Sequence, residues 1–337
     1  MPARIEDVAA HAGVSTKTVS RVLNGHTSVR ANLRARIEAS MRALNYVPNP
    51  AARGLAGNRS YLVALLYDNP TVTSSYIMGL IVGVLQACKG TPFNAVLHPF
   101  DSADDLAAQI DGFVATHRPD ALVLVPPHAN NIKLLQRLDE LDIRYSTISS
   151  KLRQSRIDIG FDERKAAADI VEHLISLGHR RIAHVTGLKG HGAYTWRLNG
   201  YRDALRKAGI AYDESLVVEG DFTFASGAAG ARKLLNRRRA PTAIFAANDD
   251  MACGVIREAY ERGLAIPDDL SVCGIDDTPV SQLISPGLTT VRQPCTEIGC
   301  LAVQSVLQSI RDPAMRLHAR VPHQMQLRAS TIAPRKP

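Results

Sequence analysis

The chain has 337 residues, of which 45% are hydrophobic and 21% charged, so it is long enough for two or three folded units and is not a disordered protein. No apolar run approaches the roughly 18 residues of a membrane span, and the N-terminus MPARIEDVAA lacks the apolar core of a signal peptide, which predicts a cytoplasmic protein. The net charge is +8, and residues 1–60 alone carry +6, as expected for a surface that binds a polyanion or for a solvated basic face.

The first residues predict two short helices joined by a tight turn. Residues 5–11 form the first helix, and Gly13 allows the chain to turn in a left-handed conformation. Ser15 stands where a helix N-cap is needed, before a helix over 16–24 that buries one apolar face and exposes a polar, basic one. This arrangement predicts a helix-turn-helix.

A third helix and a proline-rich linker follow. The apolar residues of the third helix recur at spacings of four, four and three, which places them on one stripe: Leu33, Ile37, Met41 and Leu44. The prolines of residues 46–50 exclude a helix interior, and residues 50–56 can form a short helix capped by Asn49. We therefore divide this part into a DNA-binding domain, 1–45, and a linker with a hinge helix, 46–60.

From residue 61 onward, short apolar runs alternate with amphipathic stretches. This alternation predicts parallel β-sheets with helices on both faces, and two successive sets predict two similar lobes. The predicted strands are 61–67, 93–98, 120–126 and 143–148 in the first set, then 180–185, 216–219, 242–246 and 270–275. The predicted helices are 74–89, 102–117, 130–140, 162–178, 194–209, 224–237 and 248–262.

The segments IEDVAAHAGVSTKTVSRVLNG and LNYVPNPAARGLAG closely resemble the lactose-repressor (LacI/GalR) family of transcription regulators. The resemblance implies that the second helix enters the major groove, with Thr16, Lys17 and Arg21 at base edges. It implies contacts to phosphates or base edges for Ser15, Thr18, Ser20 and Asn24. It further implies that residues 50–56 enter the minor groove, where Ala52 contacts DNA and Leu55 wedges into a base step, although Leu55 could instead pack on the core.

The core resembles the same family at LGHRRIAHVTG, WRLNGYRDAL, ANDDMACGVI and GIDDTP. The resemblance implies a periplasmic-binding-protein-like core over 61–337, with a ligand between two lobes and crossovers near residues 160, 292 and 321. The N-lobe would comprise about 61–160 and 294–320. The C-lobe would comprise about 161–291 and 321–333.

The resemblance also implies effector contacts at the carboxyl ends of the strands. Arg197 would donate to ligand hydroxyls or a carboxylate, Asn248 would contribute its amide, Asp276 would accept two hydroxyls, and Phe222 would stack on the ligand ring. Tyr67, Asp68 and Tyr76 would line the other lobe. Other interpretations stay open: Asn248 could only cap a helix, Arg197 could be a surface salt-bridge partner, Phe222 could be core, and Asp277 could only shape the turn.

The five cysteines contain no CxxC pair, which favours reduced, mostly buried thiols over a metal or redox site. No catalytic arrangement stands out, and we expect no enzyme activity, cofactor or metal. The four histidines between residues 170 and 195 are interpreted as structural or loop residues: His173, His179, His184 and His191.

Together these features predict a homodimeric, nucleoid-associated regulator that binds near-palindromic operator DNA. A small-molecule effector, a sugar or sugar derivative, would release it by allostery; we expect no membrane partner. Three alternatives stay open: regulation by a purine-like co-repressor, which Phe222 would also suit, a sugar-binding transport protein, and an enzyme on the same core.

Overall fold

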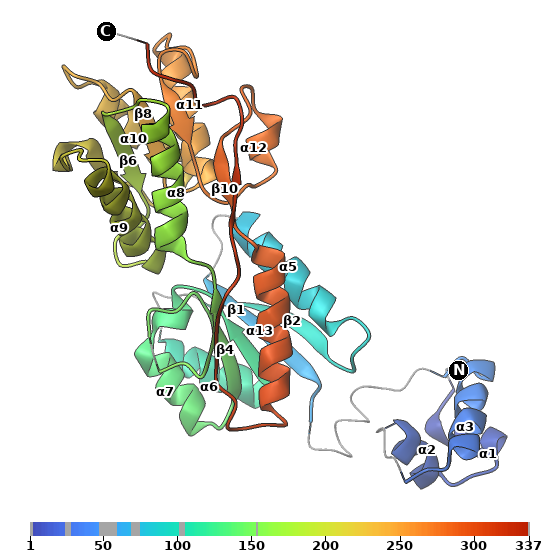
Figure 1. Ribbon diagram of the computed structural model, residues 1–337. Helices are drawn as coiled ribbons and strands as arrows, with labels where there is room; N and C mark the ends of the chain where they lie inside the picture. The colour runs from blue at the N-terminus through green and yellow to red at the C-terminus, as the bar shows by residue number, and fades with distance from the viewer. Residues whose placement is uncertain are drawn as a thin grey trace. The chain divides into compact units, whose positions relative to one another are not determined.

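The computed structural model describes residues 3–23, 28–46, 59–68, 75–100, 105–152 and 154–335 (Figure 1). It divides the chain into two compact units, Met1–Tyr61 and Leu62–Pro337, so the second unit starts within one residue of the predicted core. Most of the predicted linker, residues 47–58, lies outside the described residues, and with it the predicted cap Asn49 and hinge helix.

The first unit is the predicted small all-α domain. Its helices are α1 (Ile5–Ala12), α2 (Thr16–Leu23) and α3 (Ala31–Ala43). One side chain from each helix, Val8, Val19 and Ile37, is fully buried in a shared core. The rest of the predicted stripe on the third helix packs against this core, which confirms the stripe: Leu33, Met41 and Leu44.

The turn between α1 and α2 forms as the glycine and the hydroxyl predict. Gly13 has φ 59° and ψ 42°, a left-handed conformation that costs a glycine little. The Oγ of Ser15 accepts the N–H of Thr18 at 3.3 Å and so caps α2. Together they set the direction in which α2 leaves the turn.

The second unit contains the two predicted lobes. Among the described residues, the N-lobe is built on a parallel six-stranded sheet in the order β11-β5-β4-β3-β1-β2. Its strands are β1 (Leu62–Asp68), β2 (Asn94–Phe100), β3 (Ala121–Leu124), β4 (Arg144–Ile148), β5 (Ile157–Gly160) and β11 (Leu317–Arg320). Its helices are α5 (Ser75–Cys88), α6 (Leu106–His117), η1 (His128–Asn130), α7 (Ile132–Glu140) and α13 (Cys295–Ser309).

Alternate residues of the central strands bury against opposite layers of helices. In β1, Val63 and Leu65 belong to the cluster formed with α5 and α13, whereas Ala64 and Leu66 belong to the cluster formed with α6 and α7. A strand buried on both faces reads as a continuous apolar run, which is why LVALL was recognisable in the sequence.

The C-lobe repeats this plan on a parallel four-stranded sheet in the order β7-β6-β8-β9. Its strands are β6 (Ile182–Thr186), β7 (Val217–Glu219), β8 (Ala243–Ala246) and β9 (Ser271–Cys273). Its helices are α8 (Glu163–Ser176), α9 (Gly192–Lys207), η2 (Glu214–Leu216), α10 (Phe224–Leu235), α11 (Asp249–Glu261) and α12 (Val280–Leu283). The predicted α/β fold class is thus confirmed.

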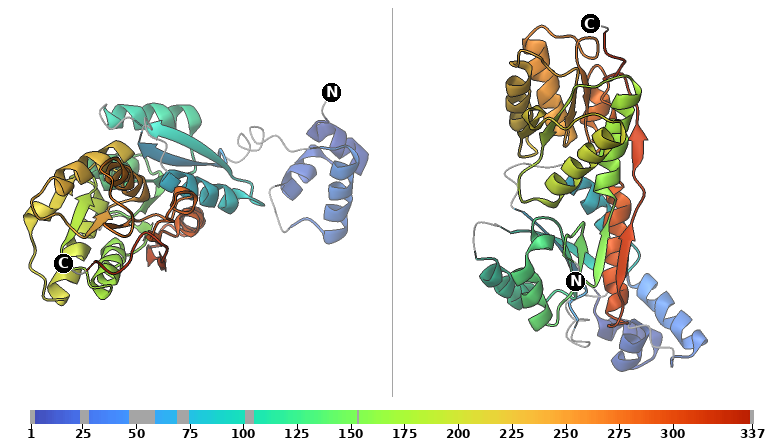
Figure 2. Two further views of the ribbon diagram at one scale, coloured as in Figure 1. Left: turned by 90° about the horizontal axis from the view of Figure 1, so that it is seen from above. Right: turned by 60° about the vertical axis from the view of Figure 1, so that its left-hand side comes forward.

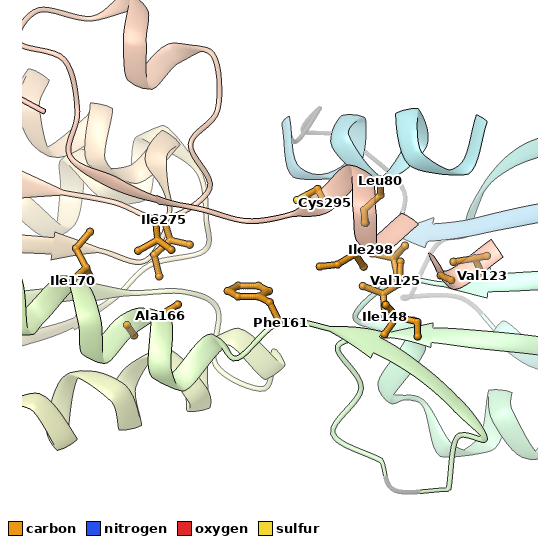
Figure 3. Packing of buried hydrophobic residues seen from close by; sticks show 14 of the residues in the cluster. Leu80, Val123, Val125, Ile148, Phe161, Ala166, Ile170, Ile275, Cys295 and Ile298 are labelled. Atoms are coloured by element: carbon orange, nitrogen blue, oxygen red, sulfur yellow. The ribbon is translucent and has the colours of Figure 1, made fainter. Parts of the chain in front are cut away.

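Three segments connect the lobes close to the predicted residues 160, 292 and 321. The first follows β5, the second follows β10 (Thr290–Arg292), and the third follows β11. After the third crossing, β12 (Gln324–Gln326) pairs antiparallel with β10. β11 pairs with β5, so two of the crossing segments run side by side (Figure 2). The buried ring of Phe161 lies at the crossing, between Ala166 and Ile170 of one lobe and Ile148 of the other (Figure 3).

Glycines let paired helices touch backbone to backbone in both lobes. A Cβ at Gly83 of α5 would lie 2.1 Å from the carbonyl oxygen of Thr296 in α13, and Gly299 of α13 approaches Leu80 in the same way. In the C-lobe, a Cβ at Gly254 of α11 would lie 2.1 Å from the carbonyl oxygen of Phe224 in α10. Neither helix pair has room for even a methyl group at these points.

Gly254→Ala is therefore expected to lower the free energy of unfolding by about 3 kcal/mol, because the α10 backbone must move to admit the methyl group. Urea denaturation measures this loss. Gly112→Ala is the matched control: Gly112 lies within α6, and a Cβ added there would meet no other atom within 4 Å, so the same change should stabilise the protein slightly. Equal stability of the two variants would contradict the close contact.

Candidate DNA-binding face and effector site

One face of α2 carries exposed polar and basic side chains. Thr16, Lys17 and Arg21 are exposed, whereas Val19 and Val22 on the opposite face are buried in the core of the unit. Lys17 and Arg21 are four residues apart, so their side chains project from the same side of the helix. The exposed face offers cationic donors for nucleic acid and uses no core residue for them.

Of the remaining predicted DNA contacts, three lie within the described residues and three lie outside them. Ser15 and Thr18 are hydrogen bonded to each other through their hydroxyls, at 2.9 Å, beside the N-terminus of α2. Ser20 is half-buried and has an interaction of its own. The predicted contacts of Asn24, Ala52 and Leu55 lie outside the described residues.

In the second unit, the predicted effector residues follow strand ends or begin helices. Tyr67 and Asp68 end β1, and Tyr76 lies in the first turn of α5. On the C-lobe, Phe222 follows β7, Asn248 follows β8, Asp276 follows β9, and Arg197 lies within α9. Parallel strands bring these carboxyl ends to one edge of each sheet.

Arg197 is buried and ion paired. Its Nε donates to Oε2 of Glu163 at 2.6 Å, and its Nη1 donates to the carbonyl oxygen of Ala247. Burial lowers the pKa of Arg197, but the carboxylates of Glu163 and Asp276 outweigh burial and raise it above its ordinary value. Arg197 does form a salt bridge, but a buried one rather than the surface pair that the sequence left open, and Glu163 is a functional candidate that the sequence pattern did not reveal.

Asp276 has an unusual backbone and a perturbed carboxyl group. Its φ is 134°, a region that residues other than glycine rarely adopt, so the surrounding contacts must hold it there. Gln293 Nε2 donates to Oδ1 of Asp276, and the Asp276 N–H donates to the carbonyl oxygen of Val291 at 2.8 Å. Burial raises the pKa of Asp276 well above its ordinary value, and Arg197 opposes this shift.

Tyr76 links the N-lobe to this cluster. Burial raises the pKa of its hydroxyl well above the ordinary value, and the charges of Cys295, Glu163, Arg197 and Asp276 also act on it. Tyr76 and Asp276 line the same groove, and the charge of Arg197 acts on both, so three separate elements bring these residues near one another. These three predicted residues form one cluster at the junction of the lobes.

Asn248 and Phe222 form a second pair. The Oδ1 of Asn248 accepts the Met251 N–H at 2.9 Å and caps α11, while its Nδ2 donates to the carbonyl oxygen of Phe222 at 3.0 Å. The capping interpretation of Asn248 is confirmed, and its amide also positions Phe222, whose φ is 70°. Gly187 lies directly under the Phe222 ring, because a Cβ there would be 2.0 Å from a ring carbon. Phe222 is half-buried and packs against the core of the C-lobe, so its interpretation as a core residue stays open.

His191 lies near this pair, although the sequence predicted a structural or loop residue at this position. Its Nδ1 accepts the Ala193 N–H at 3.2 Å, so the ring proton sits on Nε2. Its ring meets that of Phe222 edge to face, with centroids 5.1 Å apart. Burial, reinforced by Arg197 and Lys151, lowers the pKa of His191 to about 4, which keeps the imidazole neutral near pH 7.

A lysine of the N-lobe contacts the C-lobe at the edge of the space between the lobes, here called the rim. Lys151 Nζ donates to the carbonyl oxygen of Gly190 at 3.1 Å, and the Lys151 N–H donates to Oδ1 of Asn130 at 2.7 Å. On the other side of the N-lobe strand ends, Asp68 lies 3.8 Å from the buried ring of His128. Tyr67 and Asp68 are half-buried, and within the described part of the chain no hydrogen bond joins them to Arg197 or Asp276.

Two further aspartates hold the loop that carries Asp276. Buried Asp277 pairs with Arg292 at 2.7 Å and with Arg328 at 2.5 Å, so it shapes the turn, as one of the open interpretations allowed. Asp249 accepts the Thr278 N–H at 2.8 Å, and burial raises its pKa to about 7. A groove of about 640 Å³ opens beside this loop, and its lining includes Tyr76, Met78, Asp276, Arg292, Gln293 and Cys295.

Apart from Cys295, which lines the groove with Tyr76 and Asp276, the cysteines lie apart from this cluster, and so do most of the histidines. Cys88, Cys273 and Cys295 are buried free thiols, and Cys253 and Cys300 are half-buried. Across the described ranges, no group of three or more His, Cys, Asp or Glu residues has the arrangement of a metal site. His184 is fully buried in the C-lobe, where its ring stacks on Phe245 at 4.4 Å.

His184 is expected to make the protein less stable in mild acid. Burial lowers its folded-state pKa to about 4, below the unfolded value of about 6.5, so only the unfolded chain binds this proton between those pH values. Its stability contribution is complete above pH 6.5 and falls by about 2 kcal/mol at pH 5. Urea unfolding of wild type and His184→Phe at pH 7.5 and pH 5 measures the difference; parallel losses in both proteins would exclude His184 as the cause.

Comparison with known proteins agrees with this architecture. A family model described as bacterial regulatory proteins, lacI family, matches residues 4–49, and one described as a periplasmic binding protein-like domain matches residues 171–331. Catabolite control protein A of Priestia megaterium is 31% identical over 335 residues, which cover 98% of this chain and 100% of that protein.

Two solved structures match the chain almost completely. The lac repressor dimer bound to operator and the anti-inducer ONPF has a TM-score of 0.82 and 28% identity, covering 99% of this chain and 100% of that one. The complex of the transcriptional regulator CelR with cellobiose has a TM-score of 0.76 and 31% identity, covering 98% of this chain and 100% of that one.

Within the described residues, no helix is both long and apolar enough to span a membrane.

The α2 face, the two-lobed core and the full-length match to a relative lead to one conclusion: this chain belongs to the lacI family of bacterial regulatory proteins, and it is a DNA-binding transcription regulator rather than an enzyme.

Proposed function

We propose that the protein is a homodimeric repressor that binds a near-palindromic operator through α2 and leaves it when a sugar occupies the cleft. The DNA-binding part of this proposal rests on one observation: Thr16, Lys17 and Arg21 are exposed on one face of α2, and the opposite face is apolar and buried. Lys and Arg side chains on a helix of this kind donate to guanine O6 and N7 in the major groove. As an operator-binding protein it would act in the cytoplasm, at the nucleoid.

Dimerisation is supported by apolar side chains left on the surface of the second unit. Met78, Val82 and Leu85 are 42–52% exposed and lie along one face of α5, at spacings of four and three. On the C-lobe, Tyr260 and Leu283 are also exposed. Apolar patches of this kind mark interfaces, and a two-fold dimer would present two α2 helices to two half-sites.

The effector site we propose centres on the cluster of Arg197, Asp276 and Tyr76, with Phe222 and His191 beside it. A carboxylate, guanidinium N–H groups, a phenol and an aromatic ring match the hydroxyl edge and the C–H face of a sugar. The relative CelR was solved with cellobiose, which supports a sugar as the class of effector. Asn248 contributes by holding Phe222, because both ends of its amide are already engaged.

Regulation would follow from the different affinity of the effector for two arrangements of the lobes. Lys151 joins the lobes at the rim through Gly190, and the crossing segments around the buried Phe161 would have to bend for the lobes to change their angle. A ligand that contacts Tyr76 on one lobe and Asp276 on the other favours the arrangement in which both contacts form. Its differential affinity sets how far operator binding shifts.

One selection experiment tests both parts of this function. Duplexes bound by the full chain are recovered from a random DNA pool, with and without a panel of sugars and purines. We expect a near-palindrome whose recovery falls with a sugar and whose binding weakens steeply with salt. Recovery that rises with a purine would replace the sugar-released repressor by a purine co-repressor, and recovery of no sequence would contradict operator binding.

A further inference from the structure

The effector cluster contains a cation that is already neutralised by the protein. The Arg197 guanidinium and the Glu163 carboxylate are 5% and 8% exposed, and their Nε–Oε2 distance is 2.6 Å. Glu163 begins α8 directly after the crossover at Phe161, so it reaches the cluster from a different element than Arg197 in α9. Glu163 and the Ala247 carbonyl use two of the five guanidinium N–H groups, which leaves three to bind a ligand.

Apart from Lys151 at the rim, the other charged groups around the cleft do not add free positive charge. Asp276 contributes a second carboxyl group beside Arg197, and Asp68 lies on the opposite lobe. Lys151 is exposed at the rim and donates to Gly190, and His191 is neutral near pH 7. Arg292, in the adjoining groove, is paired with buried Asp277. Arg197 and Arg292, the two arginines named here, are therefore each paired with a carboxylate of the protein.

We infer that Glu163 determines the charge class of the effector: it holds Arg197 as a neutral donor and so restricts the site to uncharged polyols, excluding sugar acids and sugar phosphates. This inference rests on the proposed function of the same site. An anionic ligand would lose its hydration without gaining an unpaired cation in the cluster, and the Glu163 carboxylate would repel it. A hydroxyl of an uncharged sugar can accept from Arg197 and donate to Asp276 at no such cost.

The pair also connects α8 to α9, so a purely structural role must be separated from control of specificity. A structural role would change the affinity for every ligand by the same factor. Control of specificity would change the ratio between an anionic ligand and its uncharged parent. That ratio is therefore the informative quantity, and it can be measured in the wild-type protein before any residue is changed.

The experiment is calorimetric titration of the full chain with matched pairs: glucose against glucuronate, glucose against glucose 6-phosphate, and ribose against ribose 5-phosphate. In wild type we expect the uncharged member to bind more tightly in each pair that binds. In Glu163→Gln we expect the affinity of the acid or phosphate, relative to its parent, to rise by about tenfold or more, because Arg197 then carries an uncompensated charge. The amide of glutamine can still accept the Nε–H.

Glu172→Gln is the matched control. Glu172 lies on the same helix, pairs with Lys207 at 3.0 Å and is 39% exposed, so the change removes the same charge outside the cluster. It should leave the ratios at wild-type values. Equal gains in the Glu163 and Glu172 variants would overturn the inference, because general electrostatics would then explain them.

The wild-type ratios keep the inference testable if Glu163→Gln does not fold. A wild-type protein released from its operator by glucuronate or a sugar phosphate, in preference to the uncharged parent, would overturn the role of Glu163 and leave the proposed function intact. A protein that binds its operator and responds to neither class would instead count against the proposed effector function itself.

Discussion

Asp276→Ala is expected to abolish the response to the effector while operator binding stays intact. The truncation removes an acceptor for ligand hydroxyls and leaves the Gln293 amide and the ligand without a partner. Each of the two ligand hydroxyls that lose this acceptor costs about 1–3 kcal/mol, so effector affinity should fall about 30-fold or more. Operator release measured against effector concentration gives the result directly.

Two further variants give this prediction its controls. Asp268→Asn changes an exposed carboxylate of the same lobe and should respond to effector as wild type does. Asp276→Asn reports the protonation state: retained affinity would mean that the buried carboxyl group binds the ligand in its neutral form, in line with its raised pKa. A normal dose response in Asp276→Ala would remove Asp276 from the site.

Lys17→Ala is expected to weaken operator binding by about 1–3 kcal/mol and to relax selection at one base position of each half-site. Lys17 is exposed on α2 and makes no contact that the folded unit needs, so the variant should fold normally. Its affinity for the effector should not change, because the residues proposed to bind the effector belong to the other compact unit. Selection from random duplexes, repeated for the variant, measures the lost preference.

Arg42→Ala provides the comparison for Lys17. Arg42 is also an exposed cation of the first unit, but it lies in the last turn of α3. Its removal should weaken all sequences about equally and reduce the salt dependence, without changing the preferred base at any position. Unchanged operator selectivity in Lys17→Ala would withdraw its assignment to a base edge.

The fold was predictable because its signals are local and periodic. Strands such as LVALL are buried on both faces and read as continuous apolar runs, and Gly13 followed by Ser15 specifies a turn and a cap. The strand-end positions of Asp276 and Asn248 followed from the same alternation. These features depend on neighbours a few residues away in the chain.

The missed parts of the site depend on contacts between distant segments. Glu163 and Arg197 are 34 residues apart, and the sequence contains nothing that distinguishes Glu163 from an ordinary first-turn carboxylate of a helix. Lys151 and Gly190 are 39 residues apart and meet only because the lobes face each other. His191 had a detectable signal, since it directly precedes a helix, but its proximity to Phe222 did not follow from that.

The glycine contacts between α5 and α13 have a mechanical consequence. One end of this pair reaches the effector cluster through Tyr76 and Cys295, and the outer face of α5 carries Met78 and its apolar neighbours. Because the two backbones touch at Gly83, no flexible side chain lies between them to absorb a displacement. The pair should therefore move as one rigid body, so that a small displacement at the proposed effector site would reach the proposed dimer interface on α5 almost undiminished.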